Sequence, residues 1–258
     1  MATRRPVFAA NWKMNTTVPE GVELFKHLRQ RLDGVEQAEV VICPPFTHLT
    51  ALHEALQGSR LRLGAQNLYW EEKGAFTGEI SPAMLRGVVS HVIIGHSERR
   101  QLFGESDADV NRKLRAALEA GLVPIVCVGE TGEQRQREET EQVLRRQIHG
   151  AAEGLSLPDS LLVAYEPVWA IGTGVAAHGP QAQAAIAFIR SEVRSLAGAA
   201  ADRIRMLYGG SVAPANIAEF MAQPDVDGAL VGGASLAADS FSQIVQSGLE
   251  AVASRGNG

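Results

Sequence analysis

A lysine, a histidine and a glutamate stand where short apolar runs of this sequence end. They are Lys13, His96 and Glu166. A carboxylate at such a position can remove a proton from carbon, while a neutral imidazole and an ammonium group stabilise the oxygen that becomes negative. Together, these residue types suit proton abstraction next to a carbonyl group and formation of an enediolate.

Each of these residues also has an ordinary structural interpretation. Glu166 precedes Pro167, which favours extended geometry at the glutamate, and its carboxylate could be a general base, a metal ligand or an ion-pair partner. No second carboxylate with metal-ligand spacing accompanies it. His96 precedes Ser97-Glu98-Arg99-Arg100, which resembles a helical turn, and a helix N-terminus favours a neutral imidazole. Lys13 alone could be a solvated lysine at the end of a strand.

Two glycine turns follow the last two apolar runs. They are Gly209-Gly210-Ser211 and Gly232-Gly233, and Ala234-Ser235-Leu236 then suggests a first helical turn. Glycines allow close approach of the backbone, and the amides at a helix start bind anions. Either turn alone is a weak signal. If the apolar runs are the strands of an α/β barrel, the position of the turns after the last two runs predicts a phosphate site, since phosphate sites of such barrels recur there.

A segment after Glu166 has the composition of a lid. An enediolate can eliminate phosphate when water reaches it, so such a site needs closure. Residues Pro167–Ala176 contain an apolar portion, Val168–Ile171, followed by Gly172-Thr173-Gly174, whose backbone amides can act as donors. We therefore expect this segment to cover the bound substrate.

Eight apolar runs alternate with amphipathic stretches along the whole chain. Several runs are apolar at consecutive positions, which indicates strands of a parallel sheet buried on both faces. Eight strands that are each followed by a helix predict a single-domain (β/α)₈ barrel, with a doubly wound open sheet as the alternative. The expected strands are Val7–Trp12, Ala38–Cys43, Leu61–Gln66, His91–Gly95, Val123–Val128, Leu161–Tyr165, Ile204–Tyr208 and Ala229–Val231.

Apolar residues at helical spacing predict the helices between these strands. One stripe consists of Val110, Leu114, Ala117 and Leu118, and a second of Ile186, Ile189, Val193 and Leu196. The charged stretch Glu133–Gln142 continues into Val143, Leu144 and Ile148, which predicts one mostly solvated helix.

The connection Gln66–Pro82 is long for a compact domain. It carries Tyr69, Trp70, Phe76 and Thr77 between several glycines. Long loops in compact domains are usually functional or interfacial. Aromatic side chains on such a loop would be poorly covered in a monomer, so we expect a partner subunit. The alternative is a surface flap that folds back on its own barrel.

Composition limits the class of protein. The chain has 258 residues and a formal net charge of -5, which argues against a general nucleic-acid binder. Its two cysteines, Cys43 and Cys127, lie in apolar runs without metal-ligand spacing, so we expect no metal and no cofactor. Neither a signal peptide nor a membrane span is expected, which makes the cytoplasm the default location.

The motifs along nearly the whole chain resemble those of the triosephosphate isomerase family. The resemblance is carried by Ala10–Asn15, Gln66-Asn67 with Glu71–Glu79, Ile94–Arg100, Cys127–Thr131, Ala164–Gly174, Tyr208–Val212 and Gly232–Leu236. It implies a homodimeric (β/α)₈ barrel over residues 1–258 that interconverts dihydroxyacetone phosphate and D-glyceraldehyde 3-phosphate. It also implies a dimerisation loop at 66–82 and an active-site lid at 166–176.

The resemblance also implies roles for individual residues. Catalysis would fall to Lys13, His96 and Glu166, with Glu98 and Thr77 in support. Substrate binding would fall to Asn11, Lys13, Gly172, Ser211, Gly232 and Gly233. No metal or cofactor is implied.

One segment departs from the family pattern. After Gly174 the family usually has a basic residue followed by Thr-Ala-Thr-Pro, whereas this chain reads Val175-Ala176-Ala177-His178-Gly179-Pro180. The next helix has therefore lost an apparent threonine N-cap, and the end of the lid has lost a charge.

Two other functional classes remain as alternatives to a triosephosphate isomerase. One is another phosphate-binding barrel isomerase, and the other is a barrel that binds a ligand without catalysis.

Overall fold

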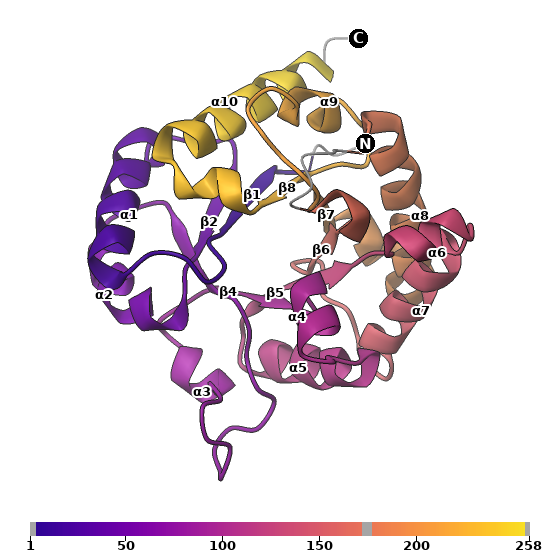
Figure 1. Cartoon of the computed structure of the whole chain (residues 1–258), viewed down its shortest axis with the longest axis horizontal. Helices are drawn as coiled ribbons and strands as arrows, with labels where there is room; N and C mark the ends of the chain where they lie inside the picture. Colours follow the sequence, from indigo (N-terminus) through magenta and orange to yellow (C-terminus); the bar gives the residue numbers. More distant parts are fainter. Residues whose placement is uncertain (1–3, 172–176, 256–258) are drawn as a thin grey trace.

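The computed structural model describes residues 4–171 and 177–255. Within these ranges, eight parallel strands form a closed barrel in which β1 also pairs with β8. The helices surround the strands as an outer ring (Figure 1). This closed barrel confirms the predicted (β/α)₈ architecture and excludes the open sheet. The strands are β1 (Val7–Asn11), β2 (Glu39–Cys43), β3 (Arg62–Ala65), β4 (His91–Ile94), β5 (Val123–Val128), β6 (Leu162–Tyr165), β7 (Arg205–Tyr208) and β8 (Gly228–Val231).

Each predicted strand is present, and its ends differ from the prediction by at most one residue. The prediction succeeds because these strands are buried on both faces, as a barrel between its own core and a helical layer requires. In β5, for example, every residue from Pro124 to Val128 is buried.

The helical layer consists of α-helices and short 3₁₀ turns. The α-helices are α1 (Val18–Leu32), α2 (Leu49–Ala55), α3 (Pro82–Leu85), α4 (Ser97–Leu102), α5 (Asp107–Glu119), α6 (Gly132–Gln136), α7 (Thr140–Ala152), α8 (Gly179–Ala197), α9 (Ile217–Met221) and α10 (Ala238–Arg255). The 3₁₀ turns are η1 (Phe46–His48), η2 (Val168–Ala170), η3 (Gly198–Asp202) and η4 (Gly233–Leu236). Among the residues described, no helix combines the length and apolar character needed to cross a bilayer.

The prediction of one helix over Glu133–Gln142 is wrong. A capping box between Thr131 and Gln134 begins the short helix α6. Glu138 then has a φ angle of 58°, a left-handed conformation that helices do not continue through. The helix α7 starts separately at Thr140. The second predicted stripe is also one residue too long, because Leu196 is 40% exposed.

The helix α8 retains a capped start despite the unusual sequence before it. His178 is its N-cap, and its backbone N–H donates to Oε1 of Gln181 at 3.2 Å. The next amide, that of Gly179, donates to Oε1 of Glu219 on α9 at 2.5 Å. The cap inferred to be lost with the family's threonine is therefore replaced by these contacts.

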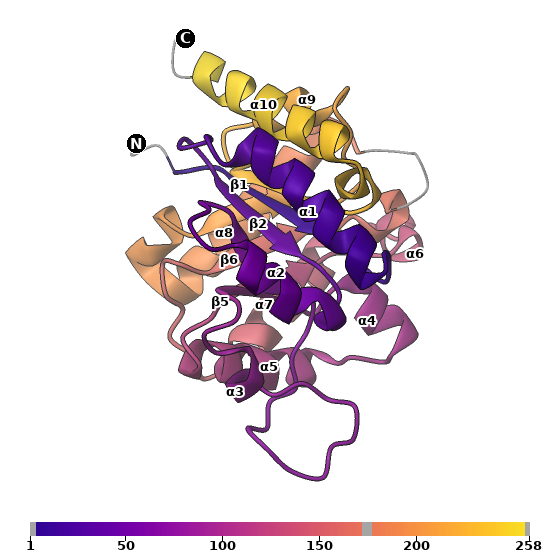
Figure 2. The ribbon, with the colours of Figure 1, turned by 90° about the vertical axis from the view of Figure 1, so that its left-hand side faces the viewer.

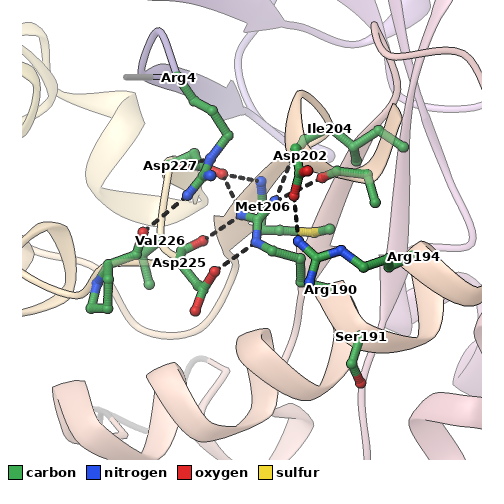
Figure 3. Close-up of polar contacts among 12 residues, drawn as sticks. Arg4, Arg190, Ser191, Arg194, Asp202, Ile204, Met206, Asp225, Val226 and Asp227 are labelled. Carbon is green, nitrogen blue, oxygen red and sulfur yellow. Dashed lines mark hydrogen bonds and ion pairs between the residues drawn. The ribbon is translucent and has the colours of Figure 1, made fainter. Parts of the chain in front are cut away.

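A buried arginine joins three elements at the end of the barrel where the strands begin (Figure 3). Arg190 of α8 is 5% exposed, and its guanidinium donates five hydrogen bonds. The carboxylates of Asp225 and Asp227 and three main-chain carbonyls accept them. Asp227 also accepts from Nε of Arg4 at 2.6 Å and from the amide of Met206 in β7 at 2.9 Å. Because every donor of Arg190 has an acceptor, this charge can be buried without a large penalty.

The loop between β3 and α3 projects away from the barrel (Figure 2). Residues Glu71–Glu79 are exposed along its length. Tyr69 and Trp70, in contrast, are half-buried and stack with their ring centroids 4.1 Å apart. The expectation that the loop aromatics are poorly covered within one chain is therefore wrong for Tyr69 and Trp70, although Phe76 remains 40% exposed.

Candidate active site

Lys13 is held in an unusual backbone conformation just beyond β1. Its φ angle is 53°, which is costly for a residue with a side chain. The amide of Lys13 donates to Oδ1 of Asn11 at 3.0 Å, and its carbonyl accepts from Nε2 of Gln66 at 2.9 Å. Its ammonium group forms a 2.6 Å ion pair with Oε1 of Glu98. Neighbours on two other connections thus hold both the backbone and the charge of Lys13.

His96 lies between β4 and α4, as the sequence predicts. It is the N-cap of α4, and its Nδ1 accepts the backbone N–H of Glu98 at 3.3 Å. A ring nitrogen that accepts a hydrogen bond carries no proton, so the proton of a neutral ring lies on Nε2. The residue is 6% exposed. Its Nε2 lies 2.9 Å from Oε1 of Glu166.

Glu166 lies just beyond β6 and is 1% exposed. Its Oε2 accepts the amide of Ser97, the first residue of α4, at 2.8 Å. Its Oε1 is close to the ring of His96 but has no partner with good hydrogen-bond geometry. The carboxylate therefore has one oxygen fixed by a helix N-terminus and one oxygen available for a proton.

Glu166 and His96 influence each other's ionisation. Burial tends to raise the pKa of Glu166, but the nearby charge of His96 and the hydrogen bond from the amide of Ser97 lower it below its ordinary value. Burial tends to lower the pKa of His96, yet the combined effects of Glu166 and Glu98 raise it above its ordinary value. The carboxylate is thus favoured in its ionised form. A neutral imidazole stays a prediction, which the Nδ1 contact favours and the charge of Glu166 opposes.

The two glycine turns leave little space around the charged residues. A Cβ on Gly232 would lie 3.3 Å from Cε of Lys13, and one on Gly209 would lie 3.0 Å from Cγ of Glu166. Gly233 begins the 3₁₀ helix η4, and a Cβ there would meet no atom within 4 Å. Gly233 thus faces open space at a helix start, where amides can bind an anion.

These residues surround one cavity of about 310 Å³ at the end of the barrel where the strands finish. It brings together Asn11, Lys13, His96, Glu166, Ser211, Gly232 and Gly233, all of which the sequence identified. Ile171, Gly210, Val212, Leu230 and Ala234 also line it. Lys13 is the one lysine or arginine among the lining residues described. A phosphorylated ligand here would therefore meet mainly backbone amides and one ammonium group.

Of the predicted site residues that the structure describes, Thr77 and Glu98 do not line this cavity. Thr77 lies at the exposed tip of the loop between β3 and α3 and does not line the cavity of its own chain. Gly172 and the rest of the segment 172–176 lie outside the described residues. The structure thus describes the predicted lid from Glu166 to Ile171.

Sequence reasoning missed the residues that support this site from outside. Glu105, which is 8% exposed, accepts the amide of Gly95 at 3.1 Å and so holds the residue before His96. Its second oxygen accepts from Arg99 at 2.8 Å and from Lys113 at 2.5 Å. Glu105 and Lys113 lie eight residues apart, a spacing that is common in ordinary helical sequence. The sequence therefore did not indicate that Glu105 supports the site.

A second missed residue is Glu130, which is fully buried behind the start of the lid. Its carboxylate accepts from the hydroxyl of Tyr165 at 3.0 Å and from Nε1 of Trp169 at 2.9 Å. Arg135 lies 3.3 Å from the same carboxylate and 4.5 Å from the centre of the Trp169 ring. The motif that contains Glu130 was visible in the sequence, but its partners come from another strand and another helix.

Among the residues described, no group of three or more histidine, cysteine, aspartate or glutamate side chains is arranged to hold a metal ion. The cavity itself offers a buried carboxylate, an imidazole and an ammonium group around a pocket with backbone donors.

Comparisons with known proteins agree with this geometry. The family model described as triosephosphate isomerase matches residues 6–248. A triosephosphate isomerase of Moorella thermoacetica is 56% identical over 245 residues, which cover 94% of this chain and 98% of the relative. One of Citrifermentans bemidjiense is 53% identical with the same coverage. A crystal structure of triosephosphate isomerase from Bartonella henselae matches with a TM-score of 0.87 and 40% identity, covering 94% of this chain and 98% of that one.

Proposed function

Because the chain belongs to the triosephosphate isomerase family and interconverts dihydroxyacetone phosphate and D-glyceraldehyde 3-phosphate, we propose that Lys13, His96 and Glu166 carry out this reaction. The observation that carries the assignment is the approach of Glu166 to His96 beside a cavity that Lys13 also lines. The two alternatives, another barrel isomerase and a non-catalytic barrel, receive no support from the relatives.

Glu166 acts as the base. Its ionised carboxylate takes the proton from the carbon next to the carbonyl group, the two carbons become doubly bonded, and the carbonyl oxygen takes the released electron pair. Nε2–H of His96 and the ammonium group of Lys13 donate to this oxygen and stabilise its charge. The hydroxyl on the carbon that lost the proton gives its own proton to the former carbonyl oxygen, with Nε2 of His96 as the relay, while the carboxylate of Glu166 returns the first proton to the neighbouring carbon. The hydroxyl oxygen thereby becomes the new carbonyl oxygen, and the isomerisation needs no oxidant.

The phosphate group of the substrate binds near Ser211, Gly232 and Gly233, with Gly172 completing the site as the lid closes. Support comes from the open space next to Gly233 and from the start of η4 there. Asn11 contributes by positioning Lys13, because its Oδ1 accepts a hydrogen bond from the backbone amide of Lys13. Binding of the phosphate group holds the reacting carbon of the substrate against Glu166. If this site is correct, a crystal soaked in phosphate or sulfate should contain the anion at these amides. An anion bound instead by several arginines would refute this site.

The lid extends from Glu166 to Ala176. The contacts of Glu130 with Trp169 and of Glu219 with Gly179 support hinges at its two ends.

The protein acts as a homodimer in the cytoplasm. A cavity of about 220 Å³ opens beside Lys13, and Met14, Phe103 and the nearby Leu102 are 96%, 69% and 74% exposed around it. Such a group of exposed apolar residues is typical of an interface. The loop 66–82 of a second copy, with Thr77 at its tip, is the occupant that we assign to this cavity. Glu98, which also lines it, keeps Lys13 in place.

Glu166→Asp tests the catalytic assignment. The change draws the carboxylate back by one methylene but preserves its charge, so kcat should fall on the order of 10²- to 10⁴-fold while substrate still binds. Glu133→Asp, on the exposed start of α6, is the matched control. An unchanged kcat in folded Glu166→Asp protein would remove Glu166 from the mechanism.

Replacing residues 75–78 with a charged tetrapeptide tests the dimer. Unpaired charge in the cavity of the second copy would be strongly unfavourable, so the variant should sediment as a monomer and lose most of its activity. A fully active monomer would contradict the proposal.

A further inference from the structure

The loop between β3 and α3 carries three aromatic rings in contact, of which Tyr69 and Trp70 stack and Phe76 is tilted against Tyr69. The centroids of Tyr69 and Trp70 are 4.1 Å apart, and those of Tyr69 and Phe76 are 4.7 Å apart. The guanidinium carbon of Arg112, on α5, lies 3.9 Å from the centre of the Trp70 ring. Because Tyr69 and Arg112 cannot occupy the same face of the indole at these distances, Trp70 lies between them. This ladder runs from a helix of the barrel to the exposed part of the loop.

The helix α5 fixes the position of Arg112. Oδ1 of Asp109 accepts from Arg112 at 2.6 Å. The other oxygen of Asp109 accepts the amide and the hydroxyl of Ser106, the N-cap of α5. Both oxygens of this carboxylate are thus in use, so the guanidinium is held at the helix surface next to Trp70.

The loop is also closed on itself within one chain. At its base, the amide of Tyr69 donates to the carbonyl of Ile80 at 2.8 Å, and at its tip the amide of Glu79 donates to the carbonyl of Phe76 at 3.0 Å. Gly74 has a φ angle of 149°, and a Cβ there would lie 2.7 Å from the Phe76 ring. A glycine at this position therefore lets the ring of Phe76 fold back over the loop.

We propose that Arg112 preorganises the dimerisation loop: by clamping Trp70 against Tyr69, it holds the loop of the free subunit in the shape that docks into a second copy. This inference rests on the proposed homodimer and names a positioning residue for it outside the catalytic site. A loop that is ordered before association loses less conformational entropy on binding. Because more of the free subunits then have a loop that is ready to dock, the apparent affinity of one subunit for another rises.

The role of Arg112 has a kinetic signature. A residue that only orders the free loop changes the rate of association, because it changes the fraction of subunits ready to dock. A residue that contacts the partner directly changes mainly the rate of dissociation. The two roles are therefore separable by measurement.

The experiment compares Arg112→Ala with two controls. Arg112→Lys keeps the positive charge but loses the planar guanidinium. Arg115→Ala removes an exposed arginine from the same helix. Sedimentation over a dilution series gives the dimer dissociation constant, and exchange between labelled and unlabelled subunits gives the dissociation rate. Activity is measured at a concentration where each variant is dimeric.

Arg112→Ala should raise the dissociation constant between about three- and thirtyfold, the range expected for loss of a partly exposed cation–π contact. Arg112→Lys should fall between this variant and the wild type, and Arg115→Ala should match the wild type. The dissociation rate and the activity per dimer should be unchanged. An unaltered dissociation constant, or a raised dissociation rate that accounts for the whole change, would overturn the role of Arg112. A wild-type protein that is monomeric and active at every concentration would instead refute the homodimer itself.

Discussion

The backbones of Gly129 and Glu166 touch where β5 and β6 end. The amide of Glu166 donates to the carbonyl of Val128 at 2.8 Å, and a Cβ on Gly129 would lie 1.7 Å from the carbonyl oxygen of Glu166. Gly129 is itself held from behind, because the side chain of Gln147 accepts from its amide at 2.7 Å and donates to its carbonyl at 3.1 Å. The position of the proposed base is therefore set by main-chain contact as well as by its carboxylate.

Gly129→Ala should misplace this base. The added methyl group cannot fit against the backbone of Glu166, so β6 or the loop after it must shift. A displacement of about 1 Å can cost about a hundredfold in rate, so kcat should fall by that order. Gly34→Ala, where a Cβ meets no atom within 4 Å, is the control. Steady-state kinetics on protein with native circular dichroism checks the expectation, and a wild-type kcat would contradict it.

Gly233→Ala should weaken binding of the phosphate group without harming the fold. The free protein has room for the methyl group, but this room is the space assigned to the phosphate. KM should rise roughly tenfold, about the effect of losing one hydrogen bond to a charged group, and inhibition by inorganic phosphate should weaken in parallel. The thermal midpoint should not decrease. If KM and phosphate inhibition both stay at wild-type values, the phosphate binds elsewhere.

Glu39→Gln should reduce stability in a pH-dependent way. His91, whose Nε2 lies 3.4 Å from Oε1 of Glu39, is the largest influence on this carboxyl, and together with Arg205 it lowers the pKa of Glu39 from 4.5 to about 2 against the effect of burial. A lowered pKa stabilises the folded state above pH 4.5, and this stabilisation disappears as pH falls towards 2. At one protein concentration, urea unfolding at pH 7 should give a free energy lower by about 3 kcal/mol for the variant.

The difference between Glu39→Gln and the wild type should shrink as the pH of the urea titration is lowered below 4.5. Glu36→Gln removes an exposed glutamate paired with Arg60 and should change the free energy of unfolding little at any pH. A constant deficit for Glu39→Gln between pH 7 and acid would show that its effect is not electrostatic.

Hydrophobic pattern and local spacing were enough to predict the barrel and most of the cavity. The strands could be located because most of their residues are apolar and buried on both faces of the sheet. The site could be located because the ends of the strands converge in a barrel, whatever sequence lies between them. The break between α6 and α7 could not be predicted, since it depends on the backbone of Glu138, a residue type that helices favour. Contacts between distant segments, such as Arg112 with Trp70, were equally invisible because neither residue carries a distinctive local motif.

The pairing of β1 with β8 determines when this chain can complete its fold during synthesis. Arg4, before β1, reaches Asp227, before β8, across a separation of 223 residues. A nascent chain that has emerged only as far as β7 leaves the hydrogen-bonding edge of β1 and the apolar face of α1 uncovered. Both are protected only when β8 and α10, which pack against β1 and α1, have been synthesised. The barrel therefore cannot close until β8 has been synthesised, and chaperones that bind open strand edges can act throughout the interval before that.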